Sequence, residues 1–432
     1  MPKGLCAHRK DDRQIWRIIF LPAKTDLLAI ASRRRAMQDT FEQAPGQSRN
    51  PRRAIVIGGS LGGLFAGNML RSIGWDVDIY ERSPRDLDSR GGGIVLQPDV
   101  VEVFRRTGID IGAMTLGVRS RHRVVFRPDG SIQSKQIAPQ TQTSWSLIYT
   151  TLKASFGEDH YHQGKVLAHV EQDGQAKTVT AIFTDGTRET GDLFVGADGG
   201  NSTVRGLHWP QEKPRYAGYV AFRGLLAEDD MPSVARETLH GDFGFANNKG
   251  SHILGYLVPG ANNDVHPGKR IYNWVWYRIV DDAMLTAVMT DRNGVERGYA
   301  VPEGLLADRW VNYLHDDALA LLPPGFRAVV RATPEPFVQA IRDLASEHMV
   351  AGRVILLGDA AAIPRPHTAA STSKAAANAL ALADELAIGD DIDAALARWE
   401  PQQVMFGKYL EKQGSETGNY LLFHRPPAAI VG

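Results

Sequence analysis

A glycine-rich turn constrains the fold of this chain more than any other feature of its sequence. The segment reads RRAIVIGGSLGGLFAGNML and starts at Arg52. Residues 54–57 form an apolar, β-branched run typical of a buried strand, and residues 61–73 carry apolar side chains at helical spacing. The glycines therefore lie on a strand-to-helix turn, which predicts a Rossmann-like α/β fold.

The turn carries the residue types that a dinucleotide pyrophosphate requires. Gly58 allows a tight bend and Gly63 lets the helix pack on the strand, while Ser60, at the position of close backbone approach, is small and can itself donate to a phosphate. Glu81 follows Gly63 by 18 residues, after the predicted strand DVDIYE, which suits an acid that binds an unphosphorylated adenosine ribose. This segment alone fits FAD and NAD equally well.

Two later motifs each place an aspartate after a strand-like run. They are GDLFVGADGGNSTVR, from Gly191, and GRVILLGDAAAIPRPHTAASTSKAAANALALADEL, from Gly352. An aspartate at the end of a buried strand, such as Asp359, can accept a hydrogen bond from a sugar-alcohol hydroxyl, and the following helix N-terminus points amides at an electron-rich ring. Taken alone, an aspartate before a helix, such as Asp359, is usually a helix cap.

Composition narrows the class of protein. The 49 Lys and Arg residues balance 49 Asp and Glu residues, so neither nucleic acid nor an anionic membrane is expected as a partner. A single cysteine, Cys6, excludes an internal disulfide and a cysteine-based metal site, and it favours a cytoplasmic location. No metal site is expected, and any redox chemistry must come from a cofactor.

The first fifty residues lack the pattern of the rest. Their longest apolar stretch is interrupted by Arg17, Pro22, Lys24 and Asp26. It therefore predicts neither an export signal nor a membrane anchor. We expect residues 1–51 to be a poorly ordered extension and linker, with the folded part beginning near Arg52; whether residues 1–36 belong to the native protein stays open.

Together the three motifs resemble the single-component FAD-dependent aromatic hydroxylases of the para-hydroxybenzoate hydroxylase type. The resemblance covers residues 52–384 and rests on the glycine turn, the Asp-Gly motif GADGGNSTVR, and Gly358-Asp359 with Pro366. It implies FAD as the cofactor and NADH or NADPH as a transient co-substrate, which agrees with the lack of a second suitable glycine-rich turn. A plain NAD-dependent dehydrogenase explains the first motif but leaves the other two without a role.

The resemblance also implies an architecture: a Rossmann-like FAD-binding domain interleaved with a sheet-based substrate domain and followed by C-terminal helices. We expect the FAD-binding domain at residues 52–118, 145–215 and 335–390, the substrate domain at residues 119–144 and 216–334, and a C-terminal helical segment at residues 391–432. The expected partners are a small aromatic substrate and O2, with a homodimer as the candidate assembly.

By this resemblance, Glu81 holds the ADP ribose and Arg90 lies beside the cofactor. Asp198 serves the pyrophosphate region and the reductant, and Asp359 binds the FAD ribitol. The expected cofactor contacts are Gly58, Ser60, Leu61, Gly62, Gly63, Glu81, Arg82, Arg90, Gln97, Asp198, Asp359, Pro366, Ala370 and Ser371.

The sequence departs from the family in the loop under the flavin. Where the family usually has a Gly-x-Gly loop, then Asn and an acid, this chain has Ala369, Ser371, Ser373 and Asn378. Ala369 and Ser371 keep the space but take a positive φ less readily than glycine, so flavin position and mobility are expected to differ. The sequence TSWS, before LIYTTLK, also lacks an arginine that many members carry there.

Three segments, YAGYVAFRGLL, SHILGYLVPG and RIYNWVWYRIV, predict strands of a sheet over the flavin. Alternation puts His252, Leu254 and Tyr256 on one face and Tyr219, Ala221 and Arg223 on another. Such aromatic stripes are often simple core. The candidate substrate contacts are Arg223, His252 and Tyr256.

Within the family, GYVAFRG, YNWVWYR and GDAAAIPRPHTAA look most like 2,6-dihydroxypyridine 3-hydroxylase and 6-hydroxy-3-succinoylpyridine 3-monooxygenase, from bacterial nicotine and nicotinate breakdown. The resemblance implies that a C4a-hydroperoxyflavin gives one oxygen atom to a hydroxylated pyridine, for example 6-hydroxy-3-succinoylpyridine, which yields 2,5-dihydroxypyridine. The alternatives are an oxidase or epoxidase acting on a non-aromatic substrate, and a non-catalytic flavin-binding protein.

A base that removes the ring-hydroxyl proton would raise the nucleophilicity of the ring. The candidates are His367, beside the flavin loop, and Tyr219. His367 has a structural alternative, in which it only hydrogen-bonds the loop backbone. Arg223 is a candidate for orienting an anionic ring or a carboxylate arm through its planar guanidinium, or it is an ordinary arginine at the edge of the core.

Overall fold

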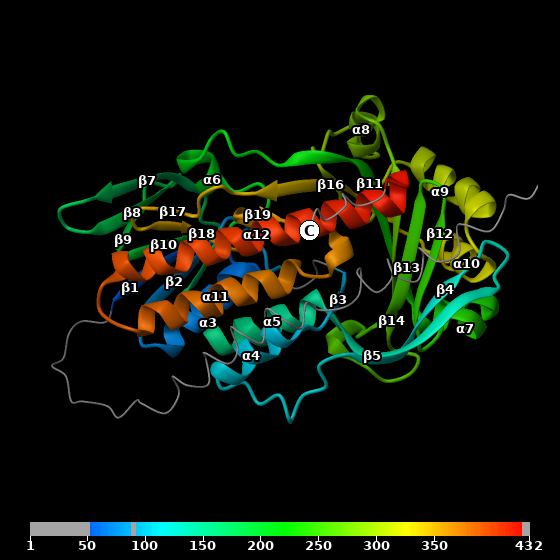
Figure 1. The fold of residues 1–432 in the computed structure, drawn as a ribbon, viewed down its shortest axis with the longest axis horizontal. Coiled ribbons are helices and arrows are strands. Elements are labelled where there is room, and N and C mark those ends of the chain that lie inside the picture. Colours follow the sequence, from blue (N-terminus) through cyan, green and yellow to red (C-terminus); the bar gives the residue numbers. More distant parts are fainter. Residues whose placement is uncertain (1–51, 88–91, 426–432) are drawn as a thin grey trace, which may run out of the picture. The chain divides into compact units, whose positions relative to one another are not determined.

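The glycine-rich turn lies where the sequence predicts it, between a strand of a parallel sheet and the helix that follows that strand. The structure, a computed structural model, describes residues 52–87 and 92–425; the predicted extension at residues 1–51 and Arg90 lie outside the described residues. Strand β1 (Arg53–Ile57) leads through the turn into α3 (Leu61–Ser72) and then β2 (Asp76–Glu81). The predicted strand-turn-helix-strand unit is therefore confirmed (Figure 1).

The parallel sheet brings all three sequence motifs to one edge. In order across the sheet its strands are β17 (Val350–Ala351), β18 (Val354–Leu356), β10 (Leu193–Gly196), β1, β2 and β6 (Tyr161–Gln163). All are parallel except β17, which pairs antiparallel with β18. β1 pairs in parallel with β10, and β10 pairs in parallel with β18, with Ile57 opposite Gly196 and Gly196 opposite Leu356. Because the carboxyl ends of parallel strands share an edge, the residues that follow β1, β10 and β18 converge there.

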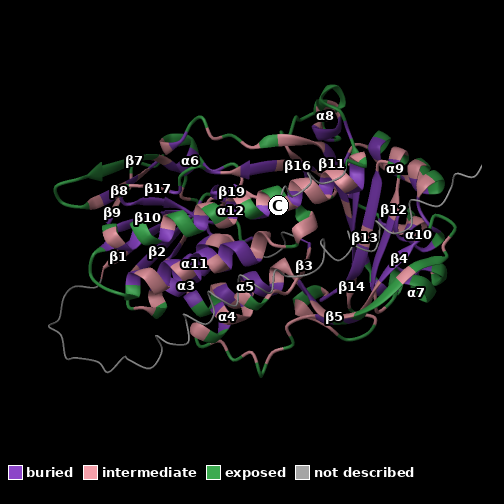
Figure 2. Cartoon of the chain, viewed as in Figure 1, coloured by how far each residue is buried: buried purple, intermediate pink, exposed green. Residues whose placement is uncertain are grey.

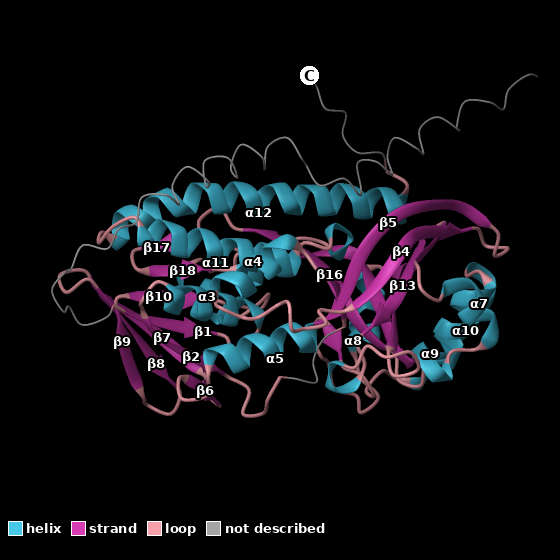
Figure 3. Cartoon of the chain, turned by 90° about the horizontal axis from the view of Figure 1, so that it is seen from below, coloured by secondary structure: helices cyan, strands magenta, loops and turns pink. Residues whose placement is uncertain are grey.

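Helices pack on one face of the parallel sheet and a small antiparallel sheet packs on the other. A Cβ on Gly63 of α3 would approach Val56, whereas a Cβ on Gly191 would approach Ile55, which points to the opposite face. α3 packs with α4 (Pro98–Arg106), α5 (Trp145–Phe156) and α11 (Ser371–Ala387), and α12 (Ile392–Phe423) runs beside α11 (Figure 3). The small sheet consists of β7 (Leu167–Asp173), β8 (Thr178–Phe183) and β9 (Arg188–Gly191).

A second, larger sheet contains the strands predicted to lie over the flavin. In order its strands are β15 (Ala300–Val301), β16 (Phe337–Ala345), β11 (Arg215–Ala227), β14 (Ile271–Ile279), β13 (Ser251–Val258), β12 (Phe243–Asn248), β4 (Val118–Phe126), β5 (Ile132–Ser144) and β3 (Gly93–Val95), and β19 (Ala362–Ile363) pairs with β16. β11, β13 and β14 confirm the three strands predicted from aromatic and β-branched runs.

The outer face of the larger sheet is a hydrophobic core. Phe222, Trp274 and Trp276 are buried there in one cluster with residues of α7 (Ser233–Leu239), α9 (Asp308–Leu321) and α10 (Pro324–Ala332). α8 (Asp282–Met289) follows β14. Figure 2 shows β13 as buried over nearly its whole length.

The inner face of the larger sheet, which we define by Tyr219, Ala221, Arg223, His252, Tyr256 and Tyr277, carries the predicted substrate residues. The sequence predicted two separate faces for β11 and β13. The pairing places Ala221 opposite Tyr277 and Tyr277 opposite His252, so both sets share a single face. Strand alternation alone does not reveal this, because the shared face depends on the register through β14.

The two sheets alternate along the chain, which confirms the interleaved architecture. The individual domain boundaries stay predictions. β3 falls within the first segment assigned to the FAD-binding domain but pairs with β5, and β19 falls within the third such segment but pairs with β16. Among the described helices, none is long and apolar enough to cross a lipid bilayer.

A buried carboxylate at the end of β11 predicts a pH-dependent stability. Glu228 lies 2.7 Å from Nε of Arg270, 2.6 Å from Nε2 of His240 and 2.8 Å from the N–H of Gly268. Burial alone would raise its pKa, but these hydrogen bonds outweigh burial and lower the pKa from 4.5 to about 2. The stabilisation is thus complete above pH 4.5 and is lost as the pH falls toward 2.

Glu228→Gln is expected to lower the free energy of unfolding by about 1–3 kcal/mol at pH 7, because the charged hydrogen bonds are lost. The difference from wild type should shrink as the pH falls from 4.5 to 2. Urea unfolding curves at several pH values measure both quantities. A difference that stays constant with pH would show that the Glu228 charge does not contribute.

Candidate active site

The glycine turn packs against the residues that follow β10. Gly58 has φ +108°, and a Cβ there would lie 2.4 Å from the carbonyl oxygen of Ala197. A Cβ on Gly63 would lie 1.8 Å from the carbonyl oxygen of Gly58, so only glycine lets α3 approach the turn this closely. These contacts agree with the roles predicted for both glycines.

The N-terminus of α3 has free hydrogen-bond donors suited to a pyrophosphate. Ser60 is the N-cap, and its side chain makes no capping hydrogen bond. The helical ladder begins with the N–H of Leu64 donating to the carbonyl of Ser60 at 3.0 Å, so the amides of Leu61, Gly62 and Gly63 have no acceptor within the helix. These amides and the Ser60 hydroxyl fit an anionic phosphate, as FAD binding requires.

Glu81 stabilises the glycine-rich turn and also lies at the position predicted for the ribose ligand. Its Oε2 accepts from the N–H of Gly59 and its Oε1 from the N–H of Ser83, both at 2.8 Å. Each carboxylate oxygen has a further lone pair for a ribose hydroxyl. Arg82 is exposed and Gln97 is half-buried ahead of α4. Their contacts with the cofactor stay predictions.

Asp198 has the capping role that the sequence allowed for Asp359. Its Oδ1 accepts from the hydroxyl of Ser202 at 2.5 Å, and its Oδ2 accepts from the N–H groups of Thr203 at 2.6 Å and Val204 at 3.2 Å, where α6 (Thr203–His208) begins. Burial raises the pKa of this carboxyl. Its predicted service to the pyrophosphate and the reductant stays a prediction.

Asp359 does not cap a helix. It follows Gly358, whose φ is +67°, in the short 3₁₀ turn η3 (Gly358–Ala360). Its Oδ1 accepts from the hydroxyl of Ser371 at 2.6 Å and from Nζ of Lys374 at 2.9 Å. In the described parts of the chain no group donates to Oδ2, which leaves that oxygen available to a sugar-alcohol hydroxyl. Lys374 was not predicted, although a lysine within an alanine-rich helical segment was a usable signal.

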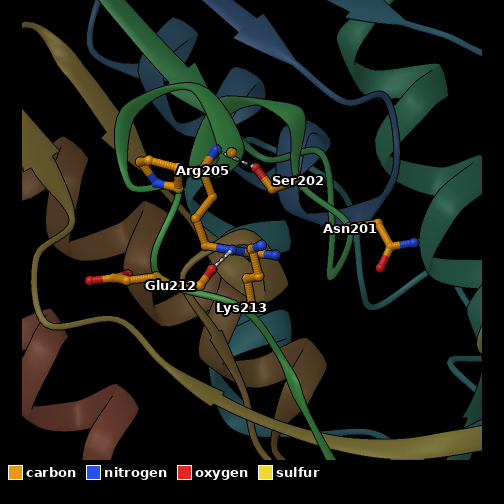
Figure 4. A pocket seen from close by; sticks show the side chains of 7 residues that line it. Asn201, Ser202, Arg205, Glu212 and Lys213 are labelled. Atoms are coloured by element: carbon orange, nitrogen blue, oxygen red, sulfur yellow. Dashed lines mark hydrogen bonds between the residues drawn. The ribbon is translucent and has the colours of Figure 1, made fainter.

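A cavity of about 420 Å³ opens beside the Asp198 motif (Figure 4). Arg205 lines it, and each nitrogen of its guanidinium makes a hydrogen bond: Nε donates to the carbonyl of Glu212 at 3.0 Å, and the two other nitrogens donate to the carbonyls of Ala360 and Gly200 at 2.7 Å. Arg205 therefore ties the Asp-Gly motif to the Gly-Asp motif. The lining residues are Asn201, Ser202, Arg205, Gly206, Pro210, Glu212 and Lys213.

Ala369 and Ser371, which stand where the family usually has glycines, have different backbone conformations. Ala369 adopts the left-handed conformation, with φ +52° and ψ 24°, at the end of η4 (Pro366–Thr368). Ser371 is the first residue of α11, so the positive φ considered for it is not needed. Ala370 is half-buried and Pro366 is exposed.

Ala369→Gly is expected to raise the free energy of unfolding by up to about 1.6 kcal/mol. The left-handed conformation costs a non-glycine residue about 1–2 kcal/mol, and the extra freedom of glycine in the unfolded chain offsets about 0.4–1 kcal/mol of the gain. Ala370→Gly, at φ −107°, is the matched control and should not stabilise. Thermal melts of both variants measure the effect, and equal shifts would contradict the strain at Ala369.

The two candidate bases form a pair. The hydroxyl of Tyr219, on β11, lies 2.9 Å from Nε2 of His367, on η4. Nδ1 of His367 is buried and has no hydrogen-bond partner among the residues described. Burial, helped by the positive charge of Arg365 and by His252, lowers the pKa of His367 well below 6.5, so the imidazole is neutral at pH 7. Burial raises the pKa of Tyr219, which keeps the phenol protonated.

A buried ion pair and the C-terminal helix hold this pair in place. Arg365 donates from Nε and a terminal nitrogen to the two oxygens of Asp343, each at 2.7 Å, and donates to Oδ1 of Asn419, on α12, at 3.0 Å. A Cβ on Gly418 would lie 2.4 Å from the Tyr219 hydroxyl. Strand β11, loop η4 and helix α12 therefore meet at the Tyr219–His367 pair.

The inner face places further polar groups near the pair. The ring of His367 lies 4.4 Å from that of Tyr277 and 5.8 Å from that of His252. Burial lowers the pKa of His252 to about 3, and its Nδ1 contacts the side-chain oxygen of Asn247. Nε of Arg223 is buried without a hydrogen-bond partner among the described residues.

Sequence reasoning missed two residues of this face. Asn273 accepts from the N–H of Gly93 at 3.1 Å, and its Nδ2 is buried without a described partner. Tyr277 stacks on His252, with ring centroids 5.7 Å apart. Alternation in YNWVWYR, which places Asn273 and Tyr277 on one face, was the signal that could have found them. No cluster of His, Cys, Asp and Glu in the described ranges could hold a metal ion.

Comparisons with known proteins agree with this geometry. The FAD binding domain family matches residues 52–277, and the FAD binding domain-like family matches residues 216–343. The 2,6-dihydroxypyridine 3-monooxygenase of Paenarthrobacter nicotinovorans is 35% identical over 83% of this chain and 89% of that protein. The 6-hydroxynicotinate 3-monooxygenase of Pseudomonas fluorescens is 27% identical over 76% of this chain and 80% of that protein.

Among solved structures, 2,6-dihydroxypyridine-3-hydroxylase from Arthrobacter nicotinovorans is similar with a TM-score of 0.81 at 32% identity, covering 89% of this chain and 96% of that chain. The predicted fold class is confirmed, and FAD, rather than NAD alone, accounts for the three motifs. The chain belongs to the FAD binding domain family and is an FAD-dependent monooxygenase of the aromatic hydroxylase type.

Proposed function

We propose that this enzyme hydroxylates a hydroxylated pyridine ring, such as 2,6-dihydroxypyridine or 6-hydroxy-3-succinoylpyridine, with NADH or NADPH as the transient electron donor. The observation that carries the proposal is the neutral His367, held by Tyr219, with a buried Nδ1 beside the inner face that has no hydrogen-bond partner in the described part of the chain. The reaction named for each of the two relatives, which introduces oxygen into a hydroxypyridine, supports the same class of substrate.

His367 acts as the general base in this proposal. With Nε2–H donating to the oxygen of Tyr219, Nδ1 is the unprotonated nitrogen and receives the proton of the ring hydroxyl. Loss of that proton makes the ring more electron-rich at the carbon to be hydroxylated. When bound, reduced FAD activates O2 and supplies the oxygen atom. The low pKa of His367 keeps the base form populated throughout the neutral range.

Arg223 is proposed to bind the anionic part of the substrate. Its buried Nε lacks a described partner, and a Cβ on Gly92 would lie 3.3 Å from one of its terminal nitrogens, so the guanidinium extends along the inner face. A planar guanidinium binds a carboxylate through two parallel hydrogen bonds. His252 and Tyr256 then line the remainder of the ring site.

Arg223→Gln is expected to raise KM for 6-hydroxy-3-succinoylpyridine by about tenfold to a hundredfold, because a charged hydrogen bond to its carboxylate is lost. The KM for 2,6-dihydroxypyridine, which has no carboxylate arm, should change much less. Steady-state kinetics with both compounds, at equal flavin content, measure the ratio. An equal change for both compounds would remove the carboxylate contact from the proposal.

The test of the function is a substrate panel with matched controls. Purified enzyme is mixed with FAD, NADH or NADPH, ¹⁸O-labelled O2 and 2,6-dihydroxypyridine, 6-hydroxy-3-succinoylpyridine or 6-hydroxynicotinate, each paired with the same ring lacking a hydroxyl. Each hydroxylated ring should give a product that contains one labelled oxygen atom, such as labelled 2,5-dihydroxypyridine from 6-hydroxy-3-succinoylpyridine, and its control should give no labelled product. A product without added oxygen would support the oxidase alternative, and no stimulated NADH or NADPH use by any compound would overturn the proposal.

A further inference from the structure

We propose that Lys374 is a cofactor-positioning residue, which together with Ser371 holds Asp359 so that its second oxygen faces the ribityl chain of FAD. The inference rests on the FAD cofactor and on Asp359 as its ribitol ligand. It does not depend on which compound is hydroxylated.

Lys374 is a buried cation, and Asp359 is its single carboxylate partner among the described residues. Its side chain is 2% exposed, and Nζ donates to Oδ1 of Asp359 at 2.9 Å and to the carbonyl of Ala362. Burying an ammonium group is costly unless it is paired and hydrogen-bonded, so its location is closely determined by these two acceptors.

Ser371 reinforces the same contact from one helical turn away. Its hydroxyl donates to Oδ1 of Asp359 at 2.6 Å, so this one oxygen accepts from two donors on α11. The Asp359 side chain is 42% exposed even though Lys374 is buried. The carboxylate is thus fixed through its inner oxygen and offers its outer oxygen at the edge of the parallel sheet. The serine that replaces a family glycine therefore has a role of its own.

The charge of this carboxylate follows from its neighbours. Burial would raise the pKa of Asp359, but the charge and hydrogen bond of Lys374, the hydroxyl of Ser371 and the charge of Arg342 outweigh burial and lower it below 3.8. Asp359 is therefore ionised at pH 7 and acts only as an acceptor. A ribityl hydroxyl must be the donor, which sets the orientation of that part of the cofactor.

A purely structural role for Lys374 makes a different prediction. In that case the ammonium only neutralises a partly buried aspartate, and removing it would destabilise the apoprotein without changing the affinity for FAD. A positioning role lowers FAD affinity in Lys374→Met, and it does so only while Asp359 is present. The double variant Lys374→Met/Asp359→Asn leaves no unpaired charge, and comparing it with Asp359→Asn alone shows whether Lys374 acts through Asp359.

The experiment measures the Kd of added FAD by flavin fluorescence quenching and the melting temperature of the apoprotein. We expect Lys374→Met to weaken FAD binding about tenfold to a hundredfold, and Ser371→Ala about threefold to tenfold. The double variant should regain apoprotein stability relative to Lys374→Met and should bind FAD about as weakly as Asp359→Asn alone. Lys408→Met, which removes a half-exposed lysine paired with Glu347 on the surface, is the control and should change neither quantity.

Wild-type FAD affinity in both Lys374→Met and Ser371→Ala would overturn the proposal, as would a double variant that binds FAD much more weakly than Asp359→Asn alone. If Lys374→Met does not fold, Ser371→Ala and the comparison of the double variant with Asp359→Asn still decide the matter. These measurements require FAD but no pyridine substrate and no electron donor. A wild type that binds FAD but hydroxylates no pyridine would contradict the proposed function and leave this inference standing.

Discussion

His367→Gln is expected to slow formation of hydroxylated product by about 10²–10⁴-fold while NADH is still consumed and hydrogen peroxide is released. Glutamine keeps a polar side chain beside Tyr219 but cannot take up the ring-hydroxyl proton. FAD binding depends on other residues, so flavin content should stay near the wild-type value. Product, peroxide and bound flavin, measured on one preparation, give all three quantities.

Tyr219→Phe is the matched control for this prediction, because it removes the hydroxyl that contacts Nε2 and leaves the imidazole in place. It should reduce hydroxylation less than His367→Gln does. Normal coupling and turnover in His367→Gln would remove His367 from the mechanism and make Tyr219 the candidate base. Loss of flavin or of thermal stability together with activity would instead favour the alternative in which His367 shapes the loop.

Asp343→Leu is expected to lower the free energy of unfolding by about 3–5 kcal/mol, because it leaves the Arg365 guanidinium buried without its carboxylate. Both residues are less than 10% exposed, and the bond between them is bidentate. The double variant Asp343→Leu/Arg365→Met should recover most of that loss, since no buried charge remains unpaired. Chemical denaturation of the three proteins measures the coupling.

The same substitution should also affect catalysis, because Arg365 immediately precedes the loop that carries His367. We expect the double variant to be stable but poorly coupled, with more peroxide per NADH than wild type. A loss in Asp343→Leu below about 1 kcal/mol would show that water or a neighbouring group replaces the carboxylate, and would contradict the assignment of this pair as the support of the loop.

Local sequence patterns predicted the elements of this fold well. The apolar run at residues 54–57, the helical spacing after Gly63 and the aromatic strands all depend on near neighbours in the chain, and each lies where expected. Pairing between distant strands has no such local signal. The single inner face that joins β11 and β13 therefore became visible only with the register through β14.

The locations of the site residues were predictable where those residues follow the ends of strands. The hydrogen-bond partners of their side chains were less predictable. Asp198 and Asp359 each follow a parallel strand within three residues, yet Asp198 accepts backbone amides while Asp359 accepts from Ser371 and Lys374. Which of these happens depends on the path of the chain after each aspartate. Lys374 was overlooked because a lysine is normally taken as a solvated residue.

The close contact between α12 and the Tyr219–His367 pair has a consequence for synthesis of the protein. Gly418 and Asn419 reach this pair late in the chain, and β18, which completes the central parallel strands, begins at Val354. A ribosome must therefore finish most of the chain before the Tyr219–His367 pair or the parallel sheet can assemble. Until then, the apolar strands made early have no complete sheet to join, so we expect nascent chains to rely on chaperones and to capture flavin only near the end of translation.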